Sequence, residues 1–85
     1  MNLFRQFGKG AFVNLERVMG VFSINNSIAR KIRDSADFSS KVLNLTYGTQ
    51  TRAIILMDSG HVVLLPEKSE RIKQKISKTV NRVQR

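Results

Sequence analysis

The chain has 85 residues with no cysteine and one histidine, and its 15 Lys and Arg against 6 Asp and Glu give a net charge of +9 and a pI near 11.0. A chain this short makes one domain; disulfides and thiolate metal sites are excluded, and His61 alone cannot supply the ligands of a zinc site. The charge favours a polyanionic partner, nucleic acid before an acidic lipid surface. No apolar run is long enough to span a bilayer and no signal peptide is recognisable, so we expect a cytoplasmic protein.

Short apolar runs predict strands in the first part of the chain. Leu3–Gln6 and Ala11–Leu15 flank Gly8-Lys9-Gly10, which indicates two strands joined by a glycine-hinged turn. Arg17–Ser23 continues the β pattern, with Gly20 as a candidate bulge. The Gly-Lys-Gly segment lacks the spacing of a phosphate-binding loop, so a structural turn is the favoured interpretation.

A first helix is predicted over about Ile28–Asp37. The preceding Asn25-Asn26-Ser27 offers several N-cap side chains. Apolar residues then recur at the spacing of one helical face, at Ile28, Ala29, Ile32 and Ala36. The basic residues between them alternate with aspartates, which is typical of a solvated surface.

The middle of the chain predicts a meander of three antiparallel strands. The three apolar runs are Val42–Tyr47, Ala53–Met57 and His61–Leu65, all rich in β-branched or aromatic residues. Asp58-Ser59-Gly60 is a tight connection, because glycine takes a positive φ at little cost and aspartate can hydrogen-bond the turn backbone. Gly48–Thr51 is expected to be looser, with side chains facing solvent.

A second helix is predicted from Pro66 to the end of the chain. Pro66 suits the first turn, and Glu67 and Glu70 complement the positive end of the helix dipole. An apolar stripe comprises Ile72, Ile76, Val80 and Val83. A basic stripe beside it comprises Arg71, Lys75, Lys78, Arg82 and Arg85. Residues 66–85 hold seven basic and two acidic residues, which is more than half of the excess charge.

These elements predict an α+β fold: a small antiparallel sheet, the meander, with one internal helix and a C-terminal amphipathic helix. The predicted organisation is an α+β domain over residues 1–65 followed by a basic amphipathic helix over residues 66–85. Because so small a domain buries only about 60% of its unfolded surface, oligomerisation is the expected source of further stability.

The wording of the middle segment is specific. Thr46-Tyr47-Gly48, then Thr51–Ser59 and His61-Val62, resembles the signature of the bacterial RemA family, the extracellular matrix regulatory proteins that switch on biofilm genes. The similarity extends from about Gly8 to Leu64. Members are small DNA-binding transcription regulators. The resemblance implies a compact α+β subunit that assembles into ring-like homo-oligomers, with double-stranded DNA along a basic face and a nucleoid-associated location.

The same resemblance implies site residues. Arg17 matches a DNA-contacting arginine of the family, and Arg52 keeps the arginine of the TYGxxTR motif. Thr49 and Gln50 stand where the family commonly has two arginines; they can hydrogen-bond a phosphate or a base edge but cannot neutralise charge. As a replacement for those two arginines, our own hypothesis is the basic stripe of the second helix, Arg71, Lys75, Lys78 and Arg82.

Structural interpretations of the same residues stay open. Arg17 can equally be a surface residue, or form a salt bridge with an acidic group such as Glu16 of a neighbouring subunit, and Arg52 can cap a carbonyl. Tyr47 can stack on a base, although an aromatic residue at a strand end is more often part of a core or interface. A hydrogen bond between Asp58 and His61 is possible across their turn.

The sequence therefore predicts a DNA-binding transcription regulator that holds the duplex mainly by phosphate contacts. The alternative is an adaptor whose basic amphipathic tail docks on a protein partner or an acidic membrane surface. RNA binding is a third possibility that charge alone does not separate from DNA binding. No nucleophile with its base and no carboxylate pair is recognisable, so we expect no enzyme, cofactor or small-molecule substrate.

Overall fold

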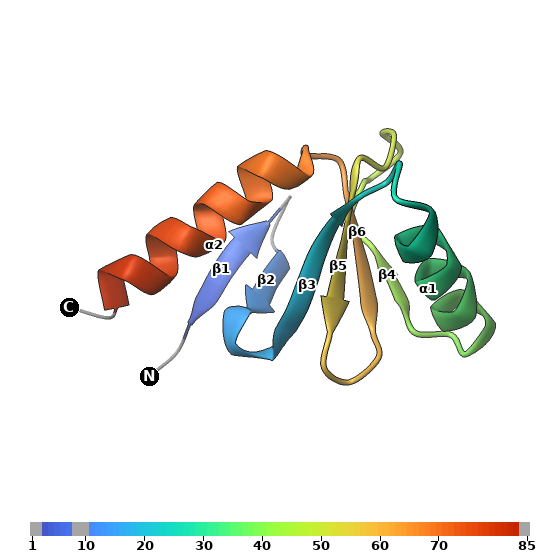
Figure 1. Ribbon diagram of the computed structural model, residues 1–85, viewed down its shortest axis with the longest axis horizontal. Coiled ribbons are helices and arrows are strands. Elements are labelled where there is room, and N and C mark those ends of the chain that lie inside the picture. Colours follow the sequence, from blue (N-terminus) through green and yellow to red (C-terminus); the bar gives the residue numbers. More distant parts are fainter. Residues whose placement is uncertain (1–2, 8–10, 84–85) are drawn as a thin grey trace.

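The computed structural model describes residues 3–7 and 11–83, with side chains through Thr79. In chain order the elements are β1 (Phe4–Phe7), β2 (Ala11–Asn14), a turn of 3-10 helix (Leu15–Arg17), β3 (Val18–Ser23), α1 (Ser27–Phe38), β4 (Val42–Asn44), β5 (Ala53–Met57), β6 (Val62–Leu65) and α2 (Ser69–Val83). The predicted α+β fold is confirmed. Figure 1 shows α2 beside the β1–β2 hairpin at one end of the molecule and α1 at the other, with the remaining strands between them.

The main sheet has four strands in the order β3-β5-β6-β4. The hairpin of β5 and β6 is antiparallel, as predicted, and the turn at Asp58-Ser59-Gly60 joins its strands, with Gly60 at φ 87°. The predicted meander is wrong for its first strand, because β4 pairs with β6 in parallel, not with β5. β5 has only two edges, and β3 and β6 occupy both, so β4 adds to the free edge of β6.

The first strand of the predicted meander, expected over Val42–Tyr47, is also shorter than predicted. β4 ends at Asn44, and the chain then makes a tight turn in which the Thr49 N–H donates to the Thr46 carbonyl at 3.1 Å. Tyr47 (φ 52°) and Gly48 (φ 87°) both lie in the left-handed region. Two consecutive residues of this kind form a type I′ turn, in which glycine is strongly favoured.

Both faces of the sheet are buried, which explains the nearly continuous apolar runs of β5 and β6. One core lies between the sheet, the hairpin and α2, and its largest members are Phe7, Ile55, Leu65 and Ile72. The other lies between the sheet and α1, and comprises Ala29, Ala36, Ile54, Val62 and Leu64. Neighbours such as Ile54 and Ile55 therefore face opposite layers, as the period of a strand requires.

The predicted details of the N-terminal half are largely confirmed. β1 and β2 pair as an antiparallel hairpin, and the pairing of β3 with β5 shifts register between Val18 and Gly20, which is the predicted bulge. α1 agrees with the predicted helix to within a residue at each end, and the side chain of Asn26 accepts from the N–H groups of Ile28 and Ala29 at 2.9 and 3.0 Å. The predicted turn at Gly8–Gly10 lies outside the described residues.

The start of α2 differs from the prediction. The helix begins at Ser69, because the first carbonyl to accept from the following turn is that of Lys68, which takes the N–H groups of Arg71 and Ile72 at 3.0 and 3.2 Å. Pro66 therefore lies in the connection between β6 and α2, not in the first helical turn. Within residues 3–7 and 11–83, no helix is long and apolar enough to cross a membrane.

Candidate nucleic-acid interface

Arg17 lies in the 3-10 turn and is tied to the β5–β6 turn by both its backbone and its side chain. Its carbonyl accepts from the N–H of Asp58 at 2.8 Å, and its Nη1 donates to the Asp58 carboxylate at 3.1 Å. The two side chains are 66% and 41% exposed, so the pair is accessible to a ligand. The partner is thus Asp58 of the same chain.

Arg52 directly precedes β5 and lies at its opposite end from Arg17. Its backbone extends the sheet, because its N–H donates to the Leu65 carbonyl at 2.8 Å and its carbonyl accepts from Ile24 at 3.0 Å. Its side chain is exposed. A five-residue strand separates the two arginines by roughly 17 Å, at about 3.3 Å per residue. The two arginines therefore lie at separate places on the surface of one protomer.

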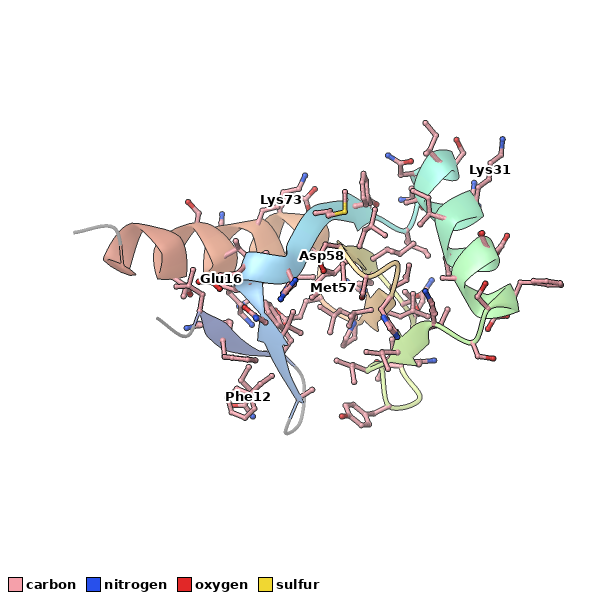
Figure 2. The ribbon with its side chains drawn as sticks, turned by 90° about the horizontal axis from the view of Figure 1, so that it is seen from below. Phe12, Glu16, Lys31, Met57, Asp58 and Lys73 are labelled. Atoms are coloured by element: carbon pink, nitrogen blue, oxygen red, sulfur yellow. The ribbon has the colours of Figure 1, made fainter. Side chains whose placement is uncertain are left out.

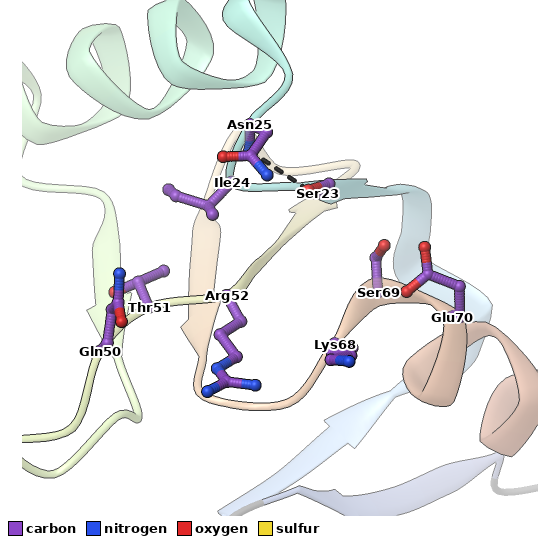
Figure 3. Close-up of a pocket in the computed structure, with 9 residues that line it drawn as sticks. All are labelled: Ser23, Ile24, Asn25, Gln50, Thr51, Arg52, Lys68, Ser69 and Glu70. Atoms are coloured by element: carbon purple, nitrogen blue, oxygen red, sulfur yellow. Dashed lines mark hydrogen bonds between the residues drawn. The ribbon is translucent and has the colours of Figure 1, made fainter.

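Around Arg52 the structure brings together polar residues from three parts of the chain. An open cavity of about 370 Å³ is lined by Asn25 after β3, Gln50 and Arg52 before β5, and Lys68 and Ser69 at the start of α2. Glu70 also lines it, so the site holds two cations and one carboxylate. Figure 3 shows the Arg52 side chain extending toward the connection that leads into α2.

Thr49 and Gln50 differ in what they can offer a ligand. The Thr49 hydroxyl donates to the Thr46 carbonyl at 2.6 Å, so its proton is already used in the turn. Only the lone pairs of its oxygen remain available to a ligand. Gln50 is exposed and lines the cavity at Arg52 as well as a neighbouring one of about 470 Å³ beside Tyr47. Of these two residues, Gln50 is the available hydrogen-bond donor.

The residues of the basic stripe of α2 differ in exposure and in the contacts that they make. Arg71 and Lys78 are exposed. Lys75 donates to both carboxylate oxygens of Glu67 at 3.0 and 2.8 Å and lies 5.7 Å from the centre of the Phe7 ring, so its charge is already used to hold the helix on the hairpin. The side chain of Arg82 lies outside the described part of the chain.

Sequence reasoning does not identify three residues of these sites. The sequence predicts Asp58 only as a turn residue, with His61 as a possible partner, whereas it pairs with Arg17 and the His61 ring instead hydrogen-bonds the Ser59 hydroxyl at 2.7 Å. Lys68 and Ser69 are not singled out because Pro66 places the predicted helix start too early. A helix predicted to begin at Ser69 would draw attention to both.

Comparison with known proteins identifies the same family that the middle segment of the sequence resembles. The family described as "RemA-like: Extracellular matrix regulatory protein A-like" matches residues 4–76, which extends past the motif region into α2. A "Putative regulatory protein" of Desulfotalea psychrophila is 41% identical over 69 residues, which are 81% of this chain and 62% of that protein. The proteins of the same description from Thermodesulfovibrio yellowstonii and Bacillus cytotoxicus are 35% and 34% identical, with 89% and 85% of their lengths covered. The chain therefore belongs to the RemA-like family.

Proposed function

We propose that this protein is a DNA-binding transcription regulator that binds duplex DNA mainly through phosphate contacts as a ring-like homo-oligomer. Membership of the RemA-like family and the names of the relatives support a regulatory role. The family description also motivates extracellular matrix genes, and hence biofilm formation, as the expected targets. The expected location is the cytoplasm, on the nucleoid.

The observation that carries the proposal is the basic surface around Arg52. Arg52, Lys68 and Arg71 are exposed, and among the described residues none of the three forms an ion pair. Gln50 adds an amide donor beside them. A surface with several unneutralised cations and neutral donors is suited to phosphate oxygens, which supply most of the contacts in protein–DNA complexes.

Exposed apolar side chains support self-assembly. Phe4 and Phe12, 50% and 64% exposed, lie diagonally across the two strands on one face of the hairpin. Figure 2 shows Phe12 projecting away from the rest of the molecule. Leu43, 52% exposed, lies on the edge strand β4 at the other side of the sheet. Contacts between two such different surfaces are heterologous, and when their rotation closes they generate a ring.

The rival interpretation, an adaptor that docks through the apolar face of α2, is less well supported. Ile72 is completely buried in the core between the sheet and the hairpin, and Ile76 packs against the same core. The described part of the apolar stripe is therefore occupied within the protomer. The exposed groups of this helix are mainly polar and basic, which suits a polyanion better than a membrane interior.

The test is duplex binding by fluorescence anisotropy at several salt concentrations. Arg52→Ala is expected to weaken binding and to lower the slope of log affinity against log salt by about 0.9 for each phosphate that the variant no longer neutralises. Lys31→Ala is the matched control, because Lys31 carries the same charge but lies on α1, away from this surface. Equal effects of the two substitutions would remove the special role of Arg52, and a monomer that ignores duplex DNA would overturn the function.

A further inference from the structure

The N-terminus of α2 has no side-chain cap. The residue that precedes the helix is Lys68, whose side chain has donors but no acceptor. Within the described residues the N–H groups of Ser69 and Glu70 have no hydrogen-bond acceptor. The other helix, α1, is capped by Asn26 through two hydrogen bonds. The first amide groups of α2, and with them the positive end of its dipole, are therefore open to an external acceptor.

Ser69 provides a second and independent sign of a ligand. The residue is only 4% exposed, yet its hydroxyl group has no hydrogen-bond partner among the described residues. No fully buried polar side-chain atom of those residues lacks a partner, so the Ser69 hydroxyl keeps a small exposure, and the residue lines the cavity. Hydroxyl groups of nearly buried residues are usually hydrogen-bonded, which makes this one unusual. Figure 3 shows it directed from the start of α2 toward the side of the cavity where Ser23 lies.

The charges around this cavity favour an anion, with one group opposing it. Arg52 and Lys68 both line it and neither forms an ion pair with a described residue. Glu70 lines it as well, and its carboxylate repels an anion. Two cations, two open backbone N–H groups and a free hydroxyl against one carboxylate leave a net preference for a compact anion with several acceptor oxygens.

We propose that the start of α2, with Lys68, Ser69 and Arg52, is a phosphate-binding site. A phosphate group matches the donors present, because its oxygens accept several N–H and O–H bonds at once and its charge complements the helix terminus. This inference rests on the proposed function in one respect only: the expected source of the phosphate is the backbone of duplex DNA. A free phosphorylated small molecule offers the same chemistry.

The experiment follows the backbone amide signals of Ser69 and Glu70 by two-dimensional NMR of the full chain, during titration with inorganic phosphate and, separately, with a short duplex. Ser69→Ala and Lys68→Ala are each expected to weaken phosphate binding about tenfold, as the removal of one charge-assisted hydrogen bond implies. Glu70→Gln is expected to strengthen it several-fold. Lys31→Ala, which removes the same charge elsewhere, is expected to leave it unchanged.

The possible results test the phosphate-binding site and the DNA-binding function independently. Movement of both amide signals with phosphate and with duplex supports the site and its DNA source. Signals that move with phosphate but not with a bound duplex keep the site, assign it to a free phosphorylated molecule and leave the function standing. Equal weakening of phosphate binding by Lys68→Ala and Lys31→Ala overturns the site. Movement with phosphate in a protein that does not bind duplex keeps the site, assigns it to a free phosphorylated molecule, and overturns the DNA-binding function. Signals that respond to neither ligand overturn the site.

Discussion

The Arg17 side chain is exposed, but its guanidinium group forms an ion pair with the carboxylate of Asp58. Its ion pair with Asp58 is largely exposed, and such pairs contribute only about 0–1 kcal/mol to stability. A phosphate that approaches Arg17 must therefore share the guanidinium group with Asp58 or displace it. Although the pair adds little to stability, it lowers the net positive charge at this end of β5.

Asp58→Asn is accordingly expected to raise duplex affinity several-fold while changing the free energy of unfolding by less than about 1 kcal/mol. Asparagine also suits the turn, so the backbone bond to Arg17 should persist. Asp34→Asn is the matched control, because Asp34 also pairs with an arginine, Arg33, at 3.0 Å. Fluorescence anisotropy with a labelled duplex measures both variants. If they bind duplex equally well, the gain comes from net charge alone and Arg17 has no special position in the interface.

The sequence alone predicts some residues of the candidate site but not their neighbours in space. Arg17 and Arg52 could be singled out because a motif carried them, and the structure places both on the surface. Their neighbours could not be predicted, because Asp58 is 41 positions from Arg17 and Lys68 is 16 from Arg52. Only the pairing of β3, β5 and β6 brings these segments together.

At the scale of elements, the bulge in β3 makes Gly20 sensitive to substitution. A Cβ atom built at Gly20 would lie 2.8 Å from the ring of Phe22, closer than van der Waals contact allows. Gly20→Ala is expected to lower the free energy of unfolding by about 1–3 kcal/mol, because the ring must shift within a packed layer. Urea denaturation measures this. Gly20→Ala combined with Phe22→Leu should cost less than the sum of the two single changes, and strict additivity would contradict the clash.

The N-cap of α1 gives a second prediction at this scale. The Asn26 side chain accepts two backbone N–H groups, so Asn26→Ala is expected to cost about 1 kcal/mol of unfolding free energy. Asn26→Asp, which keeps the acceptor oxygen, should restore most of that stability. Thermal unfolding followed by circular dichroism distinguishes the variants. An alanine variant as stable as the parent would show that the cap contributes nothing.

Sequence patterns identify the strands and helices better than they identify which elements lie side by side. The apolar run Ala53–Met57 and the turn at Asp58-Ser59-Gly60 are local features, and the predictions of the β5–β6 hairpin and its turn are both confirmed. The partner of β4 is not local, because alternation indicates which face of a strand is buried but not which edge is free. The predicted start of α2 is wrong because Pro66 is equally compatible with a connection.

At the scale of the whole molecule, assembly is expected to depend on the outward face of the hairpin. Replacing Phe4 and Phe12 by serine should reduce the molar mass in solution, because the exposed rings are the largest apolar groups on that face. Light scattering with and without duplex measures this, and circular dichroism verifies that the variant folds. A folded variant with the parent's mass would place the subunit contact elsewhere.

The parallel pairing of β4 with β6 has a consequence for biosynthesis. β4 leaves the ribosome about 20 residues before β6, the strand that it joins, and β5 lies between the two in sequence and pairs with the other edge of β6. Until residue 65 has been made, α1 lacks most of the apolar surface that covers its inner side. Released chains that end within the 58–60 turn should therefore be protease-sensitive, whereas released chains that include residue 65 gain that half of the core in one step.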